Sequence, residues 1–333
     1  MTKENNLRPD NLLQKIIHCQ AKNTKVLLKK KDGFVYINCP ACESNNYKLL
    51  FEKNSFRFVS CSDCETLYVN PRPSYEMLRS FSNSPLVVKT WNELICKSED
   101  YRRREVFQPR ARRVVELCKK YKNQARKIVD VGAGHGLFCD ELKKLDFFNE
   151  IIAVEPLQER AGFCRKMGVF VIENSIEDIE LNGVDVITNF ELIEHLSSPK
   201  TFLLSCSRAL SSGGLFIITT PNIKGFDLIT LGSKSDNIGA PNHLNYFHTA
   251  SLQKLLEKSG FKVLEILTPG KLDAELVRKK INEGVFDISG QPFLKEVLIN
   301  NWQTLGQSFQ DYLVDNKLSS HLWMVARKEK SGV

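Results

Sequence analysis

Short apolar runs alternate with helical segments through the second half of the chain. The runs are rich in β-branched residues, as is typical of strands, and the segments between them carry helical spacing. Such alternation is typical of βαβ units around a parallel sheet. A longer helical stretch is predicted at Phe293–Leu313. The pattern predicts a sheet of seven strands, at Lys127–Val131, Glu150–Glu155, Val169–Ile172, Val184–Asn189, Leu215–Thr220, Lys262–Thr268 and His321–Arg327.

The first 121 residues follow a different pattern. Residues 1–33 are polar and predict a helical lead-in. From residue 34 to 73, paired cysteines interrupt short apolar runs, and Asn70-Pro71-Arg72-Pro73 can continue neither a helix nor a central strand. Residues 74–121 regain helical spacing. We therefore expect a small unit at 34–73, linking helices at 74–121 and an α/β domain at 122–328.

The composition is that of a globular protein, with 333 residues, 42% hydrophobic and 26% charged. No run approaches the roughly 18 apolar residues of a membrane span, and the polar start lacks a signal-peptide pattern, which predicts a cytoplasmic protein. Residues 1–130 hold 26 Lys and Arg against 14 Asp and Glu, a net charge of +12, and the remainder holds 21 against 25, a net charge of −4. The basic part could attract phosphates or other anions, or could be a solvated helix face.

Four cysteines have the spacing of metal ligands. Cys39-Pro40-Ala41-Cys42 and Cys61-Ser62-Asp63-Cys64 are two C-x-x-C pairs, a pattern typical of zinc sites. Four thiolates complete a closed tetrahedral shell, so the metal is predicted to be structural and to hold together a unit too small to fold on its own core. The alternative is redox pairs or unrelated cysteines. Core packing is expected for the other cysteines, at positions 19, 96, 118, 139, 164 and 206.

A glycine-rich turn follows the first predicted strand of the α/β domain. The turn is Gly132-Ala133-Gly134-His135-Gly136. Its glycines allow positive φ and close approach of a ligand, and free N–H groups at the next helix start favour a carboxylate or phosphate. Glu155 ends the next strand, where its carboxylate can accept hydrogen bonds from both ribose hydroxyls. A dinucleotide fingerprint would have its third glycine where Leu137 stands, which argues against NAD.

The run from Val129 to Gly136, followed by Val154-Glu155-Pro156, resembles motifs I and II of class I S-adenosylmethionine-dependent methyltransferases. The resemblance covers roughly residues 110–328 and implies a Rossmann-like, seven-stranded α/β fold with S-adenosylmethionine as the cofactor. In that family the loop glycines line the methionine and ribose moieties, the acid holds the ribose, and residues after the third strand contact adenine. The implied cofactor-binding residues are Asp130, Gly132, Gly134, Gly136, Glu155, Pro156, Ser175, Ile176, Glu177, Phe190 and Glu191.

After the fourth predicted strand, residues 190–196 resemble the Glu-x-x-Glu-His signature of small-molecule methyltransferases related to quinone- and sugar-modifying enzymes. Parallel sheets bind ligands outside the carboxyl ends of their strands, so His195 is expected near the sulfonium methyl. It is the predicted general base, with Glu194 beside it, and could take a proton from a hydroxyl or from a carbon beside a ketone. The alternative is a helix-start residue that hydrogen-bonds Glu191 or the backbone.

Residues 241–248, Pro-Asn-His-Leu-Asn-Tyr-Phe-His, form a predicted loop before a helix that Thr249 could cap. The segment resembles the His/Tyr segment of sugar C-methyltransferases. His243 and Tyr246 are therefore candidate acceptor contacts. The alternative is that this patch of histidines and aromatics packs the loop down.

A zinc ribbon in front of this domain resembles the layout of methyltransferases that act on nucleotide-linked deoxysugars. The implied function is methyl transfer to O, N or C of a sugar or nucleotide-sugar in surface glycan biosynthesis of the bacterial type. From Gly232 onward the chain departs from sugar C-methyltransferases. There are three alternatives: an RNA methyltransferase that docks RNA with its ribbon, an O-methyltransferase of a quinone-like molecule, and a non-catalytic cofactor-binding protein. The ribbon lacks interleaved aromatic residues on which bases could stack, which argues against RNA. The oligomeric state stays open.

Overall fold

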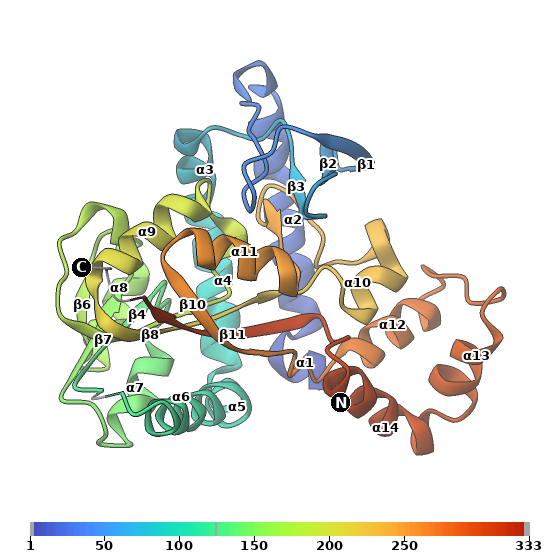
Figure 1. Cartoon of the computed structure of the whole chain (residues 1–333). Coiled ribbons are helices and arrows are strands. Elements are labelled where there is room, and N and C mark those ends of the chain that lie inside the picture. The colour runs from blue at the N-terminus through green and yellow to red at the C-terminus, as the bar shows by residue number, and fades with distance from the viewer. Residues whose placement is uncertain (1–2, 124, 330–333) are drawn as a thin grey trace.

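The computed structural model describes residues 3–123 and 125–329. Met1 and Thr2 of the predicted lead-in, and Gln124 of the predicted α/β domain, lie outside the described residues. A large sheet with helices around it forms the body of the molecule, a small sheet lies at its top, and a group of helices projects to one side (Figure 1). Among the described residues, no helix combines the length and apolar character that a membrane span requires.

The large sheet has seven strands in the order β10-β11-β8-β7-β4-β5-β6. β8, β7, β4, β5 and β6 are parallel, and β11 runs antiparallel to both of its neighbours. The predicted Rossmann-like α/β sheet is thus confirmed. Its strands are β4 (Lys127–Val131), β5 (Glu150–Val154), β6 (Phe170–Ile172), β7 (Val184–Phe190), β8 (Leu210–Pro221), β10 (Phe261–Leu267) and β11 (His321–Lys328).

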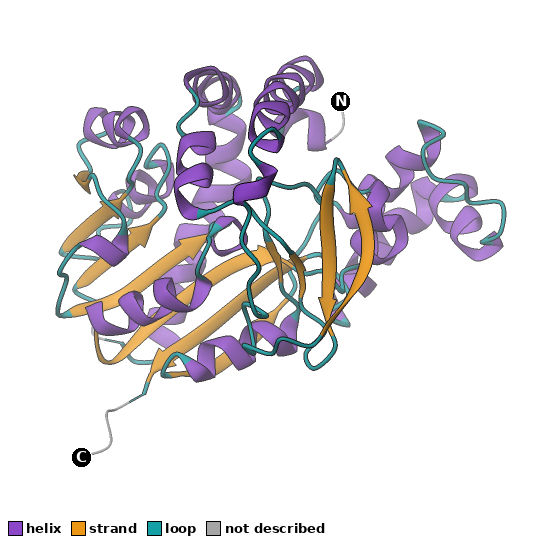
Figure 2. Cartoon of the chain, turned by 90° about the horizontal axis from the view of Figure 1, so that it is seen from above, coloured by secondary structure: helices purple, strands orange, loops and turns teal. Residues whose placement is uncertain are grey.

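Both faces of this sheet are buried, because helices cover each of them (Figure 2). Successive side chains of a strand point to opposite faces. Val129 and Val131 accordingly join one core cluster while Ile128 joins the other. A central strand buried on both faces reads as a continuous apolar run, which is why the pattern predicted these strands well. The covering helices are α6 (Gln108–Lys120), α7 (Leu137–Lys143), α8 (Gln158–Lys166), α9 (Pro199–Ala209) and α11 (Thr249–Lys258).

The small sheet has four antiparallel strands in the order β1-β2-β3-β9. Residues 34–73 supply β1 (Tyr47–Lys53), β2 (Phe56–Cys61) and β3 (Leu67–Val69). The fourth strand, β9 (Asn245–Tyr246), comes from the segment that we expected to be a loop. The expectation fails here because β3 would otherwise present an edge of unpaired N–H and C=O groups, which the distant segment satisfies.

The helices before residue 121 pack against each other and against both sheets. Leu12 and Ile16 of the lead-in lie against Leu94, and Leu27 joins the core of the small sheet. The lead-in helix α2 therefore bridges the linking helices and the small sheet (Figure 1). These elements are α1 (Lys3–Leu7), α2 (Asp10–Leu28), η1 (Lys31–Gly33), α3 (Tyr75–Ser82), α4 (Pro85–Lys97), α5 (Glu99–Arg102) and η2 (Arg103–Phe107).

A group of helices forms the projecting side of the molecule, around a core cluster of Leu231, Val277 and Leu298. Only the stretch 293–313 was expected to be helical. Ala274, Val277 and Ile281 have helical spacing that could have predicted α12 as well. These elements are α10 (Phe226–Leu231), η5 (Gly232–Lys234), α12 (Asp273–Asn282), α13 (Pro292–Lys295), η6 (Glu296–Asn300) and α14 (Trp302–Asp315). The division of the chain at residues 33, 73 and 121 stays a prediction.

Candidate functional site

Three neighbouring parallel strands end at the same edge of the large sheet. The glycine turn follows β4, Glu155 follows β5, and Glu191 follows β7. The crevice rule for open α/β sheets predicts ligands at this edge. The predicted cofactor and catalytic residues are thus gathered on one side of the sheet.

Three glycines of the turn after β4 have positive φ, 79° at Gly132, 58° at Gly134 and 76° at Gly136. A Cβ on Gly136 would lie 2.9 Å from the Sγ of Cys164 and 3.2 Å from its Cα, so this glycine lets α8 approach the turn. A Cβ on Gly134 would meet nothing within 4 Å. The turn is therefore closed toward the protein at Gly136 and open at Gly134.

The carboxylate of Glu155 is tied to this turn. It accepts hydrogen bonds from the backbone N–H of Gly134, at 2.8 Å, and of Leu157, at 3.0 Å. Only 3% of Glu155 is exposed, and this burial raises the pKa of its carboxyl. A carboxylate has about four lone-pair sites, so two remain for further donors such as hydroxyls. Pro156, the next predicted contact, is exposed.

Beneath the turn, Asp130 is buried near the carboxyl end of β4. Its carboxyl accepts a 2.7 Å hydrogen bond from the hydroxyl of Thr188 on β7, and burial raises the pKa of Asp130 to about 7. Asn189, next along β7, donates from its amide nitrogen to the carbonyl of Val131 at 3.0 Å, while its buried Oδ1 finds no partner among the described residues. Our sequence reasoning missed Thr188 and Asn189, although two polar residues in a central strand were a signal.

Phe190 and Glu191 continue from β7 into the site. The guanidinium of Arg110 lies 4.2 Å from the centroid of the Phe190 ring, a cation–π contact. Glu191, at φ 52°, accepts a 2.7 Å hydrogen bond from the hydroxyl of Thr219, and its carboxylate lies 3.4 Å from the Nδ1 of His321. Arg110 and His321 therefore belong to this site, and neither was predicted as a site residue.

The predicted adenine contacts follow the edge strand β6. Ile176 and Glu177 lie in the 3-10 helix η3 (Ile176–Asp178), and Ser175 directly precedes it. Ile176 is buried, and burial raises the pKa of Glu177. The N–H of Glu155 donates to the carbonyl of Ile172 in β6, at 3.1 Å. These residues thus lie at the same edge of the sheet as Glu155.

Glu194 and His195 lie in the 3-10 turn η4 (Ile193–His195). The carboxyl of Glu194, 1% exposed, accepts a 2.9 Å hydrogen bond from the hydroxyl of Thr220, and burial raises the pKa of Glu194 well above its usual range. The Nδ1 of His195 lies 2.6 Å from the carbonyl oxygen of Asn242. Because a carbonyl can only accept, Nδ1 carries the proton and the lone pair of the neutral ring is on Nε2.

His243 lies close to this turn, whereas the hydroxyl of Tyr246 is buried and hydrogen-bonded within its own loop. The rings of His243 and His195 are 4.7 Å apart, and Nδ1 of His243 donates to the carbonyl of Asn237 at 3.0 Å. Single ligand atoms of Glu194, His195 and His243 lie within 4.8 Å of one another, close enough to hold one cation. Tyr246 is fully buried and its hydroxyl accepts from the N–H of Gly239 at 2.9 Å, so it packs the loop down, which was the alternative to an acceptor contact.

The four predicted metal ligands gather in one cluster. The Sγ atoms of Cys39 and Cys64 lie 3.4 Å apart, those of Cys42 and Cys61 3.5 Å apart, and all four fall within 4.8 Å of one another. Tetrahedral zinc with Zn–S bonds of about 2.3 Å requires sulfur atoms about 3.8 Å apart, so the set fits such an ion. Cys39 and the hydroxyl of Thr66 lower the pKa of Cys64 to about 4, which favours a thiolate.

Each C-x-x-C pair forms a turn of the same kind. In the first, the N–H of Glu43 donates to the carbonyl of Cys39 at 2.9 Å, and in the second the N–H of Glu65 donates to the carbonyl of Cys61 at 3.0 Å. Both glutamates have positive φ, 69° and 59°. The two turns therefore present their thiols in matching ways. Five of the other cysteines are buried as expected, but Cys96 is exposed.

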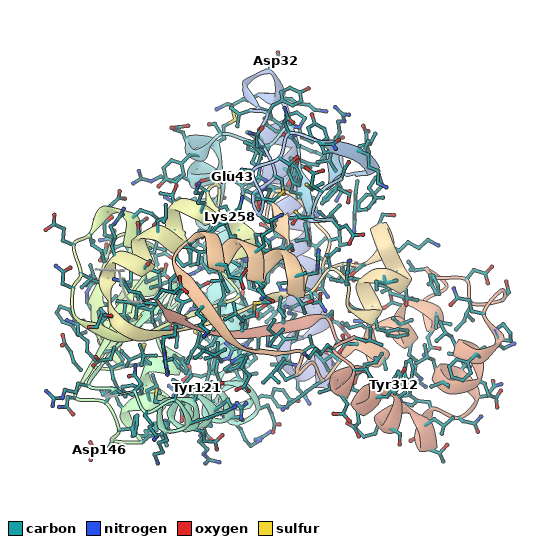
Figure 3. The ribbon with its side chains drawn as sticks, in the orientation of Figure 1. Asp32, Glu43, Tyr121, Asp146, Lys258 and Tyr312 are labelled. Atoms are coloured by element: carbon teal, nitrogen blue, oxygen red, sulfur yellow. The ribbon has the colours of Figure 1, made fainter. Side chains whose placement is uncertain are left out.

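The cluster is fastened to the α/β domain. The Nζ of Lys258 on α11 donates to the carbonyl of Cys42 at 2.9 Å and lies 3.9 Å from the carboxylate of Glu43, the two side chains labelled near one another in Figure 3. The Nε2 of His248 donates to the carbonyl of Cys64 at 2.8 Å. Both cysteine turns thus contact the chain segment that carries β9 and α11.

Comparisons of this chain with known proteins agree on one family, that of methyltransferase domains. The model of a family described as a methyltransferase domain matches residues 100–266. A protein of Mycolicibacterium smegmatis named probable S-adenosylmethionine-dependent methyltransferase is 30% identical over 146 residues, covering 43% of this chain and 54% of that protein. The ubiquinone biosynthesis O-methyltransferase of Maricaulis maris is 29% identical over 136 residues, covering 37% of this chain and 52% of that protein. The chain spans about half the length of the curated relatives it matches.

Among solved structures, an S-adenosylmethionine-dependent methyltransferase from Clostridium acetobutylicum matches with a TM-score of 0.48 and 11% identity. The match covers 72% of this chain and 99% of that chain.

Proposed function

Because this chain belongs to the methyltransferase domain family, we propose that it transfers a methyl group from S-adenosylmethionine to a small-molecule acceptor. One observation carries the proposal: the ends of β4, β5 and β7 bring the open glycine turn, the buried carboxylate of Glu155 and the Glu194-His195 turn to one edge of the sheet. A cofactor site and a base are thus side by side.

The chain's own groups suit this cofactor. S-Adenosylmethionine supplies an electrophilic methyl group on a sulfonium. Gly134 leaves room for the ligand beside the backbone, and the two unused lone-pair sites of Glu155 can accept both ribose hydroxyls. Ser175, Ile176 and Glu177 would contact the adenine. Arg110, beside Phe190, is a cation available to the carboxylate of the methionine moiety.

His195 is the proposed general base. Its Nδ1 donates to the carbonyl of Asn242, so the lone pair of the neutral ring is on Nε2. Partial burial lowers the pKa of His195, which keeps the ring neutral and ready to accept a proton at neutral pH. Glu194 lies beside this base, with 3.9 Å between its Oε1 and the Nε2 of His195.

Zinc is the proposed occupant of the cysteine cluster. Four thiols and no open position suit a structural ion rather than a catalytic one. Bound there, the ion would hold together β1, β2 and β3, because this small sheet cannot form a sufficient hydrophobic core by itself.

We propose a sugar or nucleotide-sugar as the acceptor. Its support is the resemblance of the layout, a zinc ribbon before this domain, to methyltransferases of nucleotide-linked deoxysugars, and the polar character of the acceptor side, which carries Glu194, His195, Asn242 and His243. The net charge of +12 on residues 1–130 suits a diphosphate-linked substrate. The setting would be surface glycan biosynthesis in the cytoplasm.

A quinone-like acceptor is the second candidate, because several relatives are named ubiquinone biosynthesis O-methyltransferase. An aromatic hydroxyl would also use His195 as its base. The two candidates differ in what surrounds the reacting atom, since a polyprenylated ring needs an apolar pocket and a nucleotide-sugar needs cations.

Calorimetric titration with S-adenosylhomocysteine tests the proposal, followed by turnover of labelled S-adenosylmethionine with a panel of nucleotide-sugars, catechols with prenyl tails, and a short RNA. We expect binding of one molecule per chain and methylation of a nucleotide-sugar. Methylation of the catechol alone would transfer the assignment to the second candidate, and methylation of the RNA alone would refute both. Absence of S-adenosylhomocysteine binding would overturn the methyltransferase proposal.

A further inference from the structure

Among the described residues, the largest fully buried side chain is that of Arg72, which is 1% exposed. Its guanidinium reaches from the small sheet to the α/β domain. Nε donates to the carbonyl of Val69 at 3.2 Å, Nη2 donates to the Oδ1 of Asn245 at 3.0 Å, and Nη1 makes a long contact of 3.5 Å with the carbonyl of Ser197. All three acceptors are neutral. A buried cation held by neutral oxygens is costly, so its place calls for a physical reason.

Asn245 passes this contact on to the turn that carries the proposed base. Because its Oδ1 accepts from Arg72, its amide nitrogen must face the other way. That nitrogen donates to the carbonyls of Leu196 at 2.8 Å, Ile193 at 3.2 Å and, more weakly, Glu194 at 3.5 Å. The backbone N–H of Leu244 donates to the same carbonyl of Glu194 at 2.8 Å.

The carbonyls of residues 193, 194, 196 and 197 therefore converge on two side-chain groups, the amide of Asn245 and the guanidinium of Arg72. Carbonyl dipoles point their negative ends at this place, which favours a positive charge there. Burial lowers the pKa of Arg72 to about 9, still above neutral pH, so the guanidinium stays charged. The charge and the turn thus stabilise each other.

Arg72 is rigidly attached to the cysteine unit. Its backbone N–H and C=O pair with Val35 at 3.0 and 2.8 Å. Asn70 exchanges hydrogen bonds with the backbone of Ile37, two residues before Cys39, at 3.0 and 3.3 Å. On the other side, β3 pairs with β9, which contains Asn245. A short chain of hydrogen bonds thus runs from the cysteine cluster to η4.

We propose that Arg72 is a positioning residue: through Asn245 it fixes the backbone of the Glu194-His195 turn, so that the folded cysteine unit sets the geometry of the acceptor side while cofactor binding is independent of it. The inference rests on the proposed role of His195 as the base. The glycine turn and Glu155 share none of these hydrogen bonds.

The test uses two variants of the full-length, zinc-loaded protein. Arg72→Lys keeps a positive charge but loses the fork that reaches both Val69 and Asn245. Asn245→Asp keeps an acceptor for Arg72 but replaces the amide donor with a carboxylate that the turn carbonyls repel. Lys224→Met is the matched control. It removes the exposed ion pair between Lys224 and Glu65, and this ion pair also links the cysteine unit to the α/β domain but does not contact η4.

Two readouts need neither acceptor nor turnover. Nitrogen NMR of the histidine rings, assigned with His195→Gln, reports the tautomer of His195, and hydrogen exchange reports the Leu244 amide. In the unaltered protein and in Lys224→Met we expect a single Nδ1–H tautomer. In both test variants we expect mixed tautomers and Leu244 exchange faster by about tenfold or more, while the affinity for S-adenosylhomocysteine changes less than about twofold.

If either test variant folds with an unchanged His195 tautomer and unchanged Leu244 exchange, the positioning role is refuted. Loss of S-adenosylhomocysteine affinity or altered signals of His135 in the glycine turn would show a general structural effect and would equally overturn it. Should Arg72→Lys not fold, Asn245→Asp alone decides between these results. Because the NMR and exchange readouts do not depend on methylation, a failure of the proposed function would be seen separately.

Discussion

The backbone N–H of Gly134 donates a 2.8 Å hydrogen bond to the carboxylate of Glu155, 21 positions further along the chain. The bond joins the turn after β4 to the end of β5 and fixes the orientation of a buried acid. It leaves lone pairs on that acid for a ligand, since each oxygen takes one backbone donor, from Gly134 or from Leu157.

Glu155→Gln should weaken cofactor binding. The amide keeps one acceptor oxygen, but its NH₂ group faces a backbone N–H and the negative charge is lost. Losing a hydrogen bond to a charged group costs about 1.5–3 kcal/mol. Calorimetry with S-adenosylhomocysteine should therefore show a loss of affinity of roughly tenfold or more. Glu180→Gln, at an exposed position, is the control. Equal affinities of the two variants would contradict the role of Glu155.

Alanine at Gly134 should mainly weaken cofactor binding, whereas alanine at Gly136 should mainly lower stability. Both positions have positive φ, which costs an L-residue about 1–2 kcal/mol. At Gly136 the new Cβ would also press against Cys164, so we expect the larger loss in the free energy of unfolding in urea. At Gly134 the methyl group points into open space, so we expect the smaller loss of stability but the larger loss of S-adenosylhomocysteine affinity. The reverse order would refute an open ligand side at Gly134.

His195→Gln should lower kcat by about 10²- to 10⁴-fold, as expected for loss of a general base, with unchanged S-adenosylhomocysteine affinity. Burial lowers the pKa of His195, and only the neutral ring is a base. In the unaltered enzyme kcat/KM should thus be flat above about pH 6.5 and fall at lower pH, and the variant should lose this limb. An acidic limb of the same shape in the variant would assign the titration to another group.

Asp130 should make the protein less stable as pH rises. Its folded pKa is about 7, whereas an unfolded Asp has a pKa of about 3.9, so the folded state holds a proton that the unfolded state has released. The free energy of unfolding therefore falls between about pH 4 and pH 7. Asp130→Asn lacks this titration. The difference in free energy of unfolding between this variant and the unaltered protein should therefore shift in favour of the variant by about 1 kcal/mol or more from pH 4 to pH 8. Thermal melts at both pH values check this; a pH-independent difference in Tm would contradict it.

Cys42→Ser should remove the metal from the cysteine cluster. We expect the zinc content to fall from about one ion per chain toward zero and Tm to fall with it, because metal binding contributes directly to the folding of such units. Cys96→Ser changes an exposed cysteine outside the cluster and should keep both values. Metal analysis and thermal melts of the two variants provide the comparison. Full zinc content in Cys42→Ser would exclude this cysteine as a ligand.

The sequence was sufficient for elements that carry local patterns. The strands of the large sheet are continuous apolar runs such as Ile128 and Val129, and buried parallel strands must be apolar on both faces. The four clustered cysteines are paired by spacing, so their meeting in one cluster required only a turn of a known kind. The glycine turn and Glu155 were predicted for the same reason, since each directly ends a recognisable strand.

What the sequence did not indicate depends on contacts between distant segments. β9 has two residues and no pattern of its own, and it exists because Leu67 and Tyr68 of β3 offer a free edge to Tyr246 and Asn245. Tyr246 was a candidate acceptor contact because its segment resembles the His/Tyr segment of sugar C-methyltransferases, but the pairing of β9 with β3 places its side chain in the core. In the sequence, Arg72 stands between two prolines and resembles an exposed loop arginine, but in the structure its side chain is buried.

Because β9 belongs to both units, the cysteine-bearing segment is not a cassette that can be moved between proteins. A fusion that transferred only residues 34–73 to another enzyme would arrive with three strands and an exposed edge at β3, a surface on which other chains can add strands. A graft that keeps its solubility must carry residues 241–248 too, even though more than 160 positions separate the two pieces.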